Sequence, residues 1–338
     1  MIEIVQMARH GSMNVSLAAC GLAPSILAAL FRAGFRYQKD LENVSARELA
    51  NEAEISVKDA VRVLEFTQNK EHSTAVGDTA LDLLQDVTKI QPISMRLLGL
   101  DGLLGGGLQR GEVTEICGGP GTGKTQLGIH ACLAVQYLAE ETGKTPSAVF
   151  IDSEGSFIIE RVASMAEHFL VDFYQVGPEK LTRDDLLRGI TYYRTHDYVE
   201  QMEVLHSLPA CFRTNECKLL VVDTIAFHFR HGFDDYAKRT RALDDVATFL
   251  HGLAADFNLA VVLINHITTK ASRDENVGSQ QRPALGESWA HSIDNRIVLE
   301  WMANSRVARL VKSAALAHDS ALFEVSERGV RDAADEEY

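Results

Sequence analysis

The chain has 338 residues, of which 46% are hydrophobic and 24% charged, a composition typical of a globular protein with a sizeable core. Its formal net charge of −14 argues against nucleic-acid adhesion by the whole surface, so any DNA contact has to come from a local basic segment. No apolar run reaches the length of a membrane span, and the five cysteines form no CxxC pair, which excludes a membrane partner and a disulfide framework from the expectations.

The N-terminal segment predicts a small helical domain. Gly11-Ser12-Met13 resembles the junction left by an affinity tag, so residues 1–12 are interpreted as a tag remnant. Residues 13–69 carry apolar side chains at helical spacing, with capping-box patterns that start at Ser45 and Ser56. A glycine between two short helices suggests a helix-hairpin-helix unit that presents backbone N–H groups to a phosphate. A helical bundle used for docking is the alternative.

Residues 70–84 begin with small and polar side chains and predict an exposed linker with a possible interface strand. From residue 113 onward, apolar strands alternate with amphipathic helices. The strands are expected at Val113–Cys117, Ala148–Asp152, Ile190–Arg194, Leu219–Asp223, Leu259–Asn265, Arg296–Trp301, Ala308–Lys312 and Leu322–Ser326. The helices are expected at Thr125–Glu141, Ile158–Phe169, Tyr198–Leu208 and Thr240–Phe257.

Continuous aliphatic runs of this kind are typical of a parallel sheet covered on both faces, and the last strands alternate with tight turns like an antiparallel edge. The sequence therefore predicts an α/β fold over residues 85–331, with a mostly parallel central sheet and an antiparallel edge. Residues 332–338 are expected to form an acidic tail.

The stretch CGGPGTGKTQL fits the P-loop pattern, with a predicted strand before it and a predicted helix after it. Glycines let the backbone N–H groups surround phosphates, and the helix N-terminus adds a positive dipole end. Lys124 is expected to reach the β- and γ-phosphates and to assist catalysis, and the Thr125 hydroxyl to bind Mg²⁺. ATP and Mg²⁺ are thus the expected cofactors, and the expected loop residues are Gly118, Gly119, Pro120, Gly121, Thr122, Gly123, Lys124, Thr125 and Gln126.

Two further carboxylates are predicted to face this loop. Asp223 ends a buried strand, where open α/β sheets bind ligands, and is expected in the metal shell. Its alternative role is to cap the following helix. Glu154, in the segment FIDSEGSF, is placed to orient or deprotonate water, with Asp152 as a support. Solvated strand ends are the alternative for both acids.

At this point the sequence resembles a known family. The P-loop, FIDSEGSF, LLVVDT and LAVVLINH occur in the order seen in RecA-type recombinases, behind a small helical domain. The segments IAFHFRHGFDDYAKRTRAL and PALGESWAHS are similar to the C-type paralogue of the eukaryotic RecA-family strand-exchange recombinase. The resemblance covers roughly residues 16–332.

The resemblance implies a RecA-type P-loop ATPase core and a DNA-repair ATPase of homologous recombination. It implies partners as well: heteromeric complexes of two or four recombinase paralogues, the recombinase filament, and single-stranded or branched DNA. It implies a location in the nucleus, with the cytoplasm as a second place. Arg161 would pack on the adenine ring, for which a guanidinium is suited; a salt bridge on the helix surface is its alternative.

Two loops that face DNA in this family fall on basic segments of the chain. Cations interleaved with aromatic residues suit a single-stranded site, although the start of a solvated helix would also explain the first segment. The first loop, residues 230–241, supplies Arg230, Lys238, Arg239 and Arg241. The second, residues 268–287, is long, polar and expected to be nearly structureless; it supplies Lys270, Arg273 and Arg282.

The chain departs from the family pattern at two places. The family usually has Asn-Gln where this chain has Asn265-His266, so His266 is expected to sense the γ-phosphate with altered coupling to DNA, or else to be a plain polar strand end. Self-polymerising members carry Phe-x-x-Ala in the linker, and residues 70–84 contain no phenylalanine. Long homofilaments are therefore not expected.

Three functions remain open from the sequence. The preferred one is a weak, partner-dependent ATPase inside a filament-remodelling complex. The second is an assembly scaffold in which ATP is a structural ligand that is not hydrolysed. The third, a strand-exchange recombinase in its own right, is disfavoured by the linker and by His266.

Overall fold

The computed structural model describes Leu17, Leu22 and residues 24–41, 44–68, 79–81, 84, 90–138, 144–173, 181–214, 216–231, 235–270 and 280–333. The chain divides into two compact units, residues 1–87 and 88–338. The predicted tag remnant and most of the predicted linker lie outside the described residues, so these boundaries stay predictions.

The first unit is helical, as the sequence predicts. Its helices share a small core in which Leu30, Leu49 and Val63 are almost fully buried. The Ser45 hydroxyl accepts from the Glu48 amide, and the Glu48 carboxylate accepts from the Ser45 amide, which confirms the capping box. The helices are α2 (Pro24–Arg32), α3 (Ala46–Glu52) and α4 (Val57–Gln68), with a 3₁₀ turn at Gln38–Leu41.

The second unit is built on one sheet with the strand order β10-β9-β8-β7-β1-β5-β4-β2-β3, and β6 pairs with β5 alone. The strands from β3 to β7 along this order are parallel, and β8, β9 and β10 add an antiparallel edge. This confirms the predicted sheet. The strands are β1 (Val113–Gly118), β2 (Ser147–Asp152), β3 (Ile190–Arg194), β4 (Cys217–Asp223), β5 (Ala260–Lys270), β6 (Gln280–Pro283), β7 (Asn295–Met302), β8 (Ser305–Lys312), β9 (Ser320–Ser326) and β10 (Gly329–Asp332).

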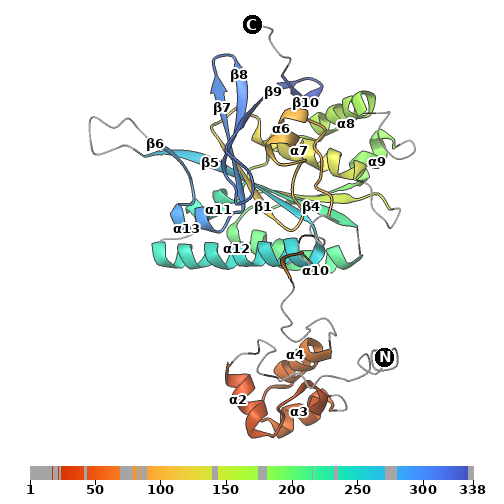
Figure 1. Cartoon of the computed structure of the whole chain (residues 1–338), viewed down its shortest axis with the longest axis vertical. Coiled ribbons are helices and arrows are strands. Elements are labelled where there is room, and N and C mark those ends of the chain that lie inside the picture. The colour runs from red at the N-terminus through yellow and green to blue at the C-terminus, as the bar shows by residue number, and fades with distance from the viewer. Residues whose placement is uncertain are drawn as a thin grey trace. The chain divides into compact units, whose positions relative to one another are not determined.

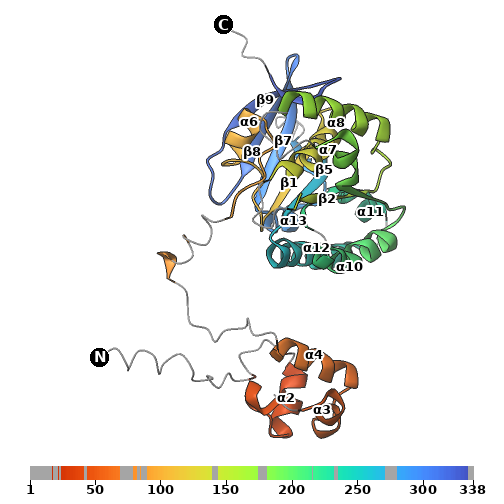
Figure 2. The same ribbon diagram turned by 90° about the vertical axis from the view of Figure 1, so that its right-hand side faces the viewer.

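Helices cover both faces of the sheet (Figures 1 and 2). Alternate residues of the central strands explain this: Leu220 and Val222 of β4 enter one core, and Leu219 and Val221 the other. One core lies under α6 (Leu98–Leu103), α7 (Lys124–Ala134), α8 (Ile159–Phe173) and α9 (Arg183–Arg188). The other lies under α10 (Tyr198–Thr214), α11 (Ala226–His231), α12 (Tyr236–Phe257) and α13 (Glu287–His291).

Three expectations were wrong in detail. The helix expected at Thr125–Glu141 ends as α7 at Ala134 and continues as a 3₁₀ turn to Tyr137. The first predicted DNA loop is largely helical, because α11 and the first turns of α12 occupy most of it. The second is not structureless at its ends: β5 runs on to Lys270 and pairs with β6 as an antiparallel ribbon, and α13 begins at Glu287.

The last strand ties back to the first helix of this unit. The Asp332 carboxylate accepts from the backbone amides of Leu98 and Gly99 at 2.7 and 3.0 Å, at the N-terminus of α6. Asp332 was predicted to belong to the acidic tail, but it is the last residue of β10. Among the described residues, no helix is long and apolar enough to cross a bilayer.

Candidate nucleotide site

The predicted phosphate loop joins β1 to α7. Gly121 and Gly123 have φ values of 75° and 103°, which lie in the left-handed region that glycine adopts readily. A Cβ on Gly123 would approach Val325 and Phe323 of β9 at 3.1 and 3.4 Å, so the antiparallel edge forms a wall of the loop. The Thr122 hydroxyl donates to the Gly119 carbonyl at 2.9 Å and closes the turn from inside. The conformation of the loop is thus fixed by its glycine backbone angles, by packing against β9 and by this internal hydrogen bond.

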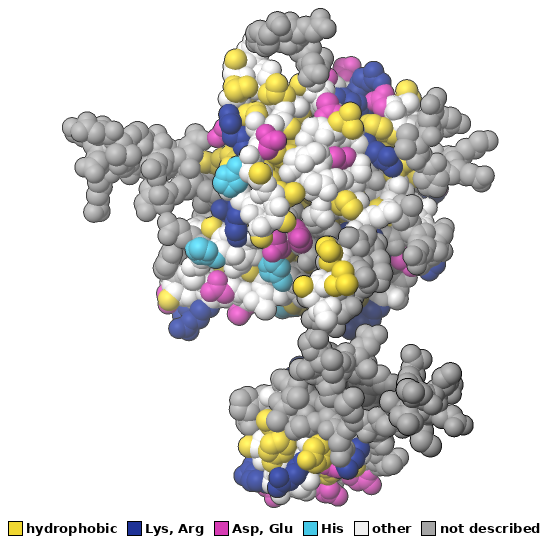
Figure 3. All heavy atoms as spheres, in the orientation of Figure 1, with side chains coloured by type: hydrophobic (Ala, Val, Ile, Leu, Met, Phe, Trp, Pro, Cys, Tyr) yellow, Lys and Arg dark blue, Asp and Glu magenta, His cyan; other side chains and the backbone are white. Residues whose placement is uncertain are grey.

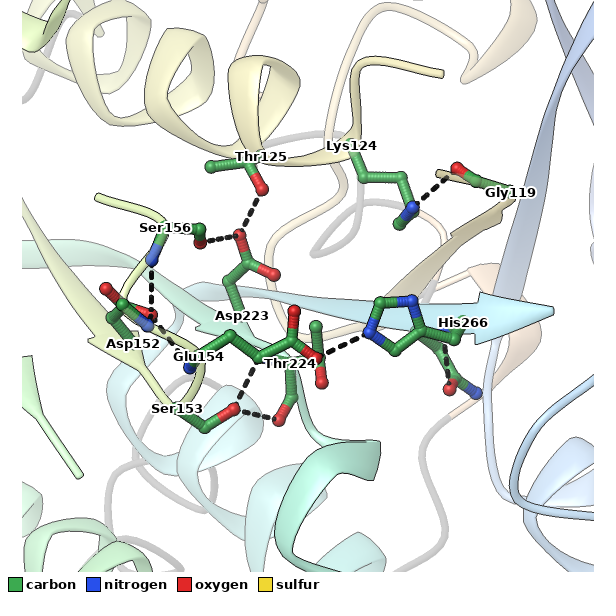
Figure 4. A network of polar contacts seen from close by, with 12 residues as sticks. Gly119, Lys124, Thr125, Asp152, Ser153, Glu154, Ser156, Asp223, Thr224 and His266 are labelled. Atoms are coloured by element: carbon green, nitrogen blue, oxygen red, sulfur yellow. Dashed lines mark hydrogen bonds and ion pairs between the residues drawn. The ribbon is translucent and has the colours of Figure 1, made fainter. Parts of the chain in front are cut away.

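Lys124 and Thr125 occupy the first turn of α7, which begins one residue before the predicted start at Thr125. The Lys124 ammonium donates to the Gly119 carbonyl at 2.8 Å, so it folds back over the loop. The Thr125 hydroxyl donates to the Asp223 carboxylate at 2.6 Å, at the end of β4 (Figure 4). Two predicted metal ligands, 98 residues apart in sequence, therefore meet at the carboxyl edge of the sheet.

The turn after β2 is organised by Asp152. One of its carboxylate oxygens accepts from the backbone amides of Glu154, Gly155 and Ser156 at 3.0, 2.7 and 3.2 Å, and the other from Phe157 at 3.1 Å. This gives physical content to the supporting role predicted for Asp152, because the turn carries Glu154. Ser156 extends the site, since its hydroxyl donates to Asp223 at 3.2 Å.

Glu154 is bound by the residue that replaces the family's glutamine. His266, in β5, donates from Nε2 to Glu154 Oε1 at 2.6 Å (Figure 4). The parallel pairing of β1 and β5 places His266 opposite Gly118, directly beside the loop. The candidate base and the candidate γ-phosphate sensor therefore face each other across the site.

The electrostatics of the site set its two carboxylates apart. Burial raises the pKa of Asp223 to about 6, although hydrogen bonds from Thr125 and Ser156 oppose this effect. The hydrogen bond from His266 lowers the pKa of Glu154. Burial also lowers the pKa of Lys124, against the attraction of Asp223 and Glu154. Glu154 is thus held as a carboxylate, and Asp223 is a buried acid without a cationic hydrogen-bond partner among the described residues.

These residues fit Mg²⁺ bound together with phosphates. Among the described residues there is no cluster of three histidine, cysteine or acidic side chains that could hold a metal by itself. Thr125 and Asp223 supply two oxygens, and Mg²⁺ bound through few protein oxygens usually completes its shell with substrate phosphates and water. A Cβ on Gly119 or Gly121 would meet nothing within 4 Å, so the loop backbone is accessible to a ligand.

The residue predicted to pack on adenine is engaged elsewhere. Arg161 donates from Nε to the Gln126 side chain at 2.7 Å and from its two terminal nitrogens to the Ser326 and Glu327 carbonyls, each at 2.6 Å. It fixes the β9–β10 turn beside α7, with the planar guanidinium held in place. The role on adenine stays a prediction, and so does that of Gln126 toward nucleotide.

The candidate DNA residues belong to two regions. Lys238, Arg239 and Arg241 lie in the first two turns of α12, where Lys238 and Arg241 are exposed. Arg230 is in α11, Lys270 ends β5 and Arg282 is in β6; Arg273 lies outside the described residues. On the face drawn in Figure 3, acidic and basic side chains are interspersed over the second unit.

Several residues of the site carry no pattern that sequence reasoning could recognise. Ser156 was not singled out because a serine in a turn has no distinctive pattern. Ser153 and Thr224 were missed too: the Ser153 hydroxyl donates to the Thr224 carbonyl and accepts from its amide, each at 2.8 Å. This pair joins the ends of β2 and β4. Its two residues meet because β2 and β4 are neighbours in the sheet, with Asp152 opposite Asp223, and the sequence does not show which strands are neighbours.

Comparison with known proteins identifies the family to which the chain is related. The Rad51 family model matches residues 87–333. "DNA repair protein RAD51 homolog 3" of Cricetulus griseus is 34% identical over 95% of this chain and 93% of its own length. The protein of the same name from Dictyostelium discoideum is 36% identical over 76% of this chain and 70% of its own.

A more distant relative is "DNA repair and recombination protein RadA" of Aeropyrum pernix, 28% identical over 92% of this chain and 95% of its own. The glycine loop with Lys124 and Thr125, the sheet order and these matches agree with one another. The chain therefore belongs to the Rad51 family of recombination and repair proteins, whose members bind ATP and are typically ATPases.

Proposed function

We propose that the chain is an ATP-binding, DNA-dependent ATPase subunit of heteromeric complexes of recombinase paralogues. These complexes bind single-stranded or branched DNA in the nucleus and promote or stabilise recombinase filaments. The observation that carries the proposal is the meeting of Lys124, Thr125, Asp223 and Glu154 at one edge of the sheet.

In the proposed reaction, Lys124 and the loop amides hold the phosphates, and Thr125 and Asp223 hold Mg²⁺. The metal would supply neutralisation of the charge that develops on the phosphate oxygens. Glu154 orients the attacking water and accepts its proton, with Asp152 fixing the turn that carries it. His266 sits where it can report the presence of the γ-phosphate to β5.

Weak turnover follows from the contact between Glu154 and His266. A carboxylate that is already hydrogen-bonded, and whose pKa is lowered by that bond, is a weaker base toward water. A partner subunit or DNA that moves β5 would release Glu154. The same contact favours one second candidate, a scaffold that binds ATP structurally without hydrolysing it.

The proposed DNA binding is supported by cations that lie at an unfavourable place in the fold, the N-terminus of a helix. Cations in the first turn of a helix are opposed by the helix dipole, yet Lys238 and Arg239 lie in the first turn of α12. Asp235 caps that helix, with its side chain accepting from Ala237 at 2.8 Å. Phosphates of a bound strand would compensate such cations, and the β5–β6 ribbon brings Lys270 and Arg282 as a second group.

The test compares Lys124→Ala and Glu154→Gln for ATP turnover and for complex assembly with paralogue partners. Lys124→Ala should abolish both. Glu154→Gln should lower turnover by roughly 100-fold or more, the usual contribution of a positioned base, and should leave ATP binding intact. Lys144→Ala serves as the control, because the Lys144 side chain is 69% exposed and outside the site.

The outcomes separate the candidates. Turnover lost in Glu154→Gln with filament promotion intact would show that the hydrolytic role is secondary to ATP binding. Assembly unaffected by both substitutions would contradict a nucleotide-controlled complex. Long filaments of this chain alone on DNA with ATP, seen by electron microscopy, would favour a recombinase in its own right.

A further inference from the structure

A fully buried carboxylate lies in the strand that leads to the phosphate loop. Glu115 of β1 is 0% exposed. Its Oε1 accepts from the Trp289 indole N–H and from the Asn265 amide, each at 2.7 Å, and its Oε2 accepts from Arg296 Nε at 2.5 Å. The hydrogen-bonding capacity of this carboxylate is therefore satisfied by protein donors rather than by solvent.

The donors come from segments that flank the second predicted DNA loop. Asn265 is in β5, just before the β5–β6 ribbon, and Trp289 is in α13, just after it. The other end of α13 is fixed as well, because the Lys312 ammonium donates to the Ala290 and His291 carbonyls at 2.8 and 3.1 Å. One side chain of β1 thus holds both sides of the ribbon.

The network continues to the nucleotide site through backbone and side-chain bonds. The Asn265 side-chain oxygen accepts from the His266 amide at 2.8 Å, while its nitrogen is held by Glu115. His266 in turn donates to Glu154 at 2.6 Å. The orientation of the Asn265 amide is therefore set from one side by Glu115, and it sets the local backbone that carries the His266 ring.

We propose that Glu115 is a positioning residue that couples α13 and the β5–β6 ribbon to Glu154 through Asn265 and His266. A displacement of α13 pulls Trp289 away from Glu115, which then no longer fixes Asn265, and the His266 ring loses its place on Glu154. The inference deepens the proposed function and rests on it, because it presupposes that nucleotide binds at Lys124.

Trp289 provides a direct readout. The chain has two tryptophans, Trp289 and Trp301, and Trp301 is 49% exposed and stacked against Arg306. In a Trp301→Phe background of the full chain, tryptophan emission reports Trp289 alone. Binding of Mg²⁺ and ATP is expected to shift this emission, and His266→Ala is expected to abolish the shift while equilibrium dialysis with radiolabelled ATP still shows binding.

Binding without an emission shift, or a shift that survives His266→Ala, would overturn the inference and leave the proposed function standing. Absence of ATP binding in dialysis would remove both. The two failures are therefore distinguishable in one set of samples.

A double-mutant cycle tests whether Trp289 and His266 are coupled in their effect on ATP turnover. Trp289→Phe keeps the aromatic bulk and removes the N–H donor to Glu115. It is expected to change the ATP turnover of the assembled complex severalfold when His266 is present, and less than about twofold in a His266→Ala background. Equal effects in both backgrounds would overturn the coupling. Glu115→Gln should behave like Trp289→Phe; if it does not fold, the Trp289→Phe cycle decides alone.

Discussion

Two buried carboxylates in the same sheet have opposite surroundings. Glu115, in β1, is 0% exposed and receives N–H donors from Asn265, Trp289 and the guanidinium of Arg296. Asp223, at the end of β4, is 1% exposed and receives only the hydroxyls of Thr125 and Ser156 among the hydrogen bonds of the described residues. Burial is nearly equal, so the difference lies in the partners.

The difference separates a structural carboxylate from a binding one. A buried charge is stable when a cation and enough donors match it, and is otherwise driven toward its neutral form. Glu115 has its cation within the fold. Asp223 has neutral hydrogen-bond partners, and burial raises its pKa to about 6. A carboxylate left in this state is prepared for a cation from outside, which is the role proposed for Mg²⁺.

The largest effect is expected from Glu115→Leu, which leaves the Arg296 guanidinium buried without its partner. Removal of one member of a buried ion pair costs about 3–5 kcal/mol of unfolding free energy. Urea unfolding of the chain should show this loss. The double variant Glu115→Leu/Arg296→Met should recover much of it, because a well-packed apolar pair avoids the unpaired charge.

The exposed ion pair of Arg309 and Glu300, at 3.1 Å in β8 and β7, provides the control. Arg309→Met should change the unfolding free energy by less than about 1 kcal/mol. A Glu115→Leu effect as small as this one would mean that the buried network contributes nothing beyond packing.

The next effect concerns pH and Asp223. Its folded pKa of about 6 lies above the ordinary 3.8, so the folded state holds a proton that the unfolded state releases between these values. The stability that this protonation contributes is complete below pH 3.8 and is lost as the pH rises through 6. Above pH 6 the charged Asp223 thus costs up to about 3 kcal/mol in the metal-free protein.

Asp223→Asn should therefore melt at a higher temperature than the natural chain at pH 8 without nucleotide, and the gap should close at pH 4. With Mg²⁺ and ATP at pH 8 the order should reverse, because ligand binding stabilises only the chain that retains the carboxylate. Thermal unfolding monitored by circular dichroism checks both. An Asn variant that is less stable than the natural chain in every condition would show that Asp223 is matched inside the fold, as Glu115 is.

The smallest effect is expected at His266, which contacts the more accessible carboxylate of the site. The His266 hydrogen bond lowers the pKa of Glu154, so His266→Gln should let that pKa rise. The acid limb of kcat/KM against pH should then move to higher pH, while the rate near pH 8 changes by less than about tenfold. His196→Gln, which breaks an exposed contact with Glu200 at 3.0 Å, is the matched control. An acid limb that stays in place would separate Glu154 from the rate-determining proton transfer.

The sheet and the phosphate loop could be predicted because their signals are local. The aliphatic runs of β1, β2, β4 and β5 and the glycine pattern need no knowledge of distant residues. Asp223 and Glu154 followed from their places at strand ends. The prediction that the two basic segments are loops was wrong for a physical reason. Polar side chains are as common in the exposed helix turns of α12 and in a two-stranded ribbon such as β5–β6 as they are in a loop.

The Glu115 network could not be predicted because nothing in its neighbourhood marks it. A single glutamate in the strand VTEICG looks like an ordinary polar interruption. Its guanidinium partner, Arg296, is 181 residues away, and its indole partner, Trp289, is 174 residues away. The contact of His266 with Glu154 was hidden for the same reason, although the departure at His266 marked the position.

The wall of the phosphate loop has a consequence for synthesis of the chain. Gly123 packs against Phe323 and Val325, and Asp332 caps α6, so the walls of the nucleotide pocket include strands that are synthesised long after the phosphate loop. A nascent chain therefore contains the complete P-loop motif long before it contains the strand against which the loop packs. A premature stop in the codons for β9 would therefore damage nucleotide binding much as a substitution within the motif does.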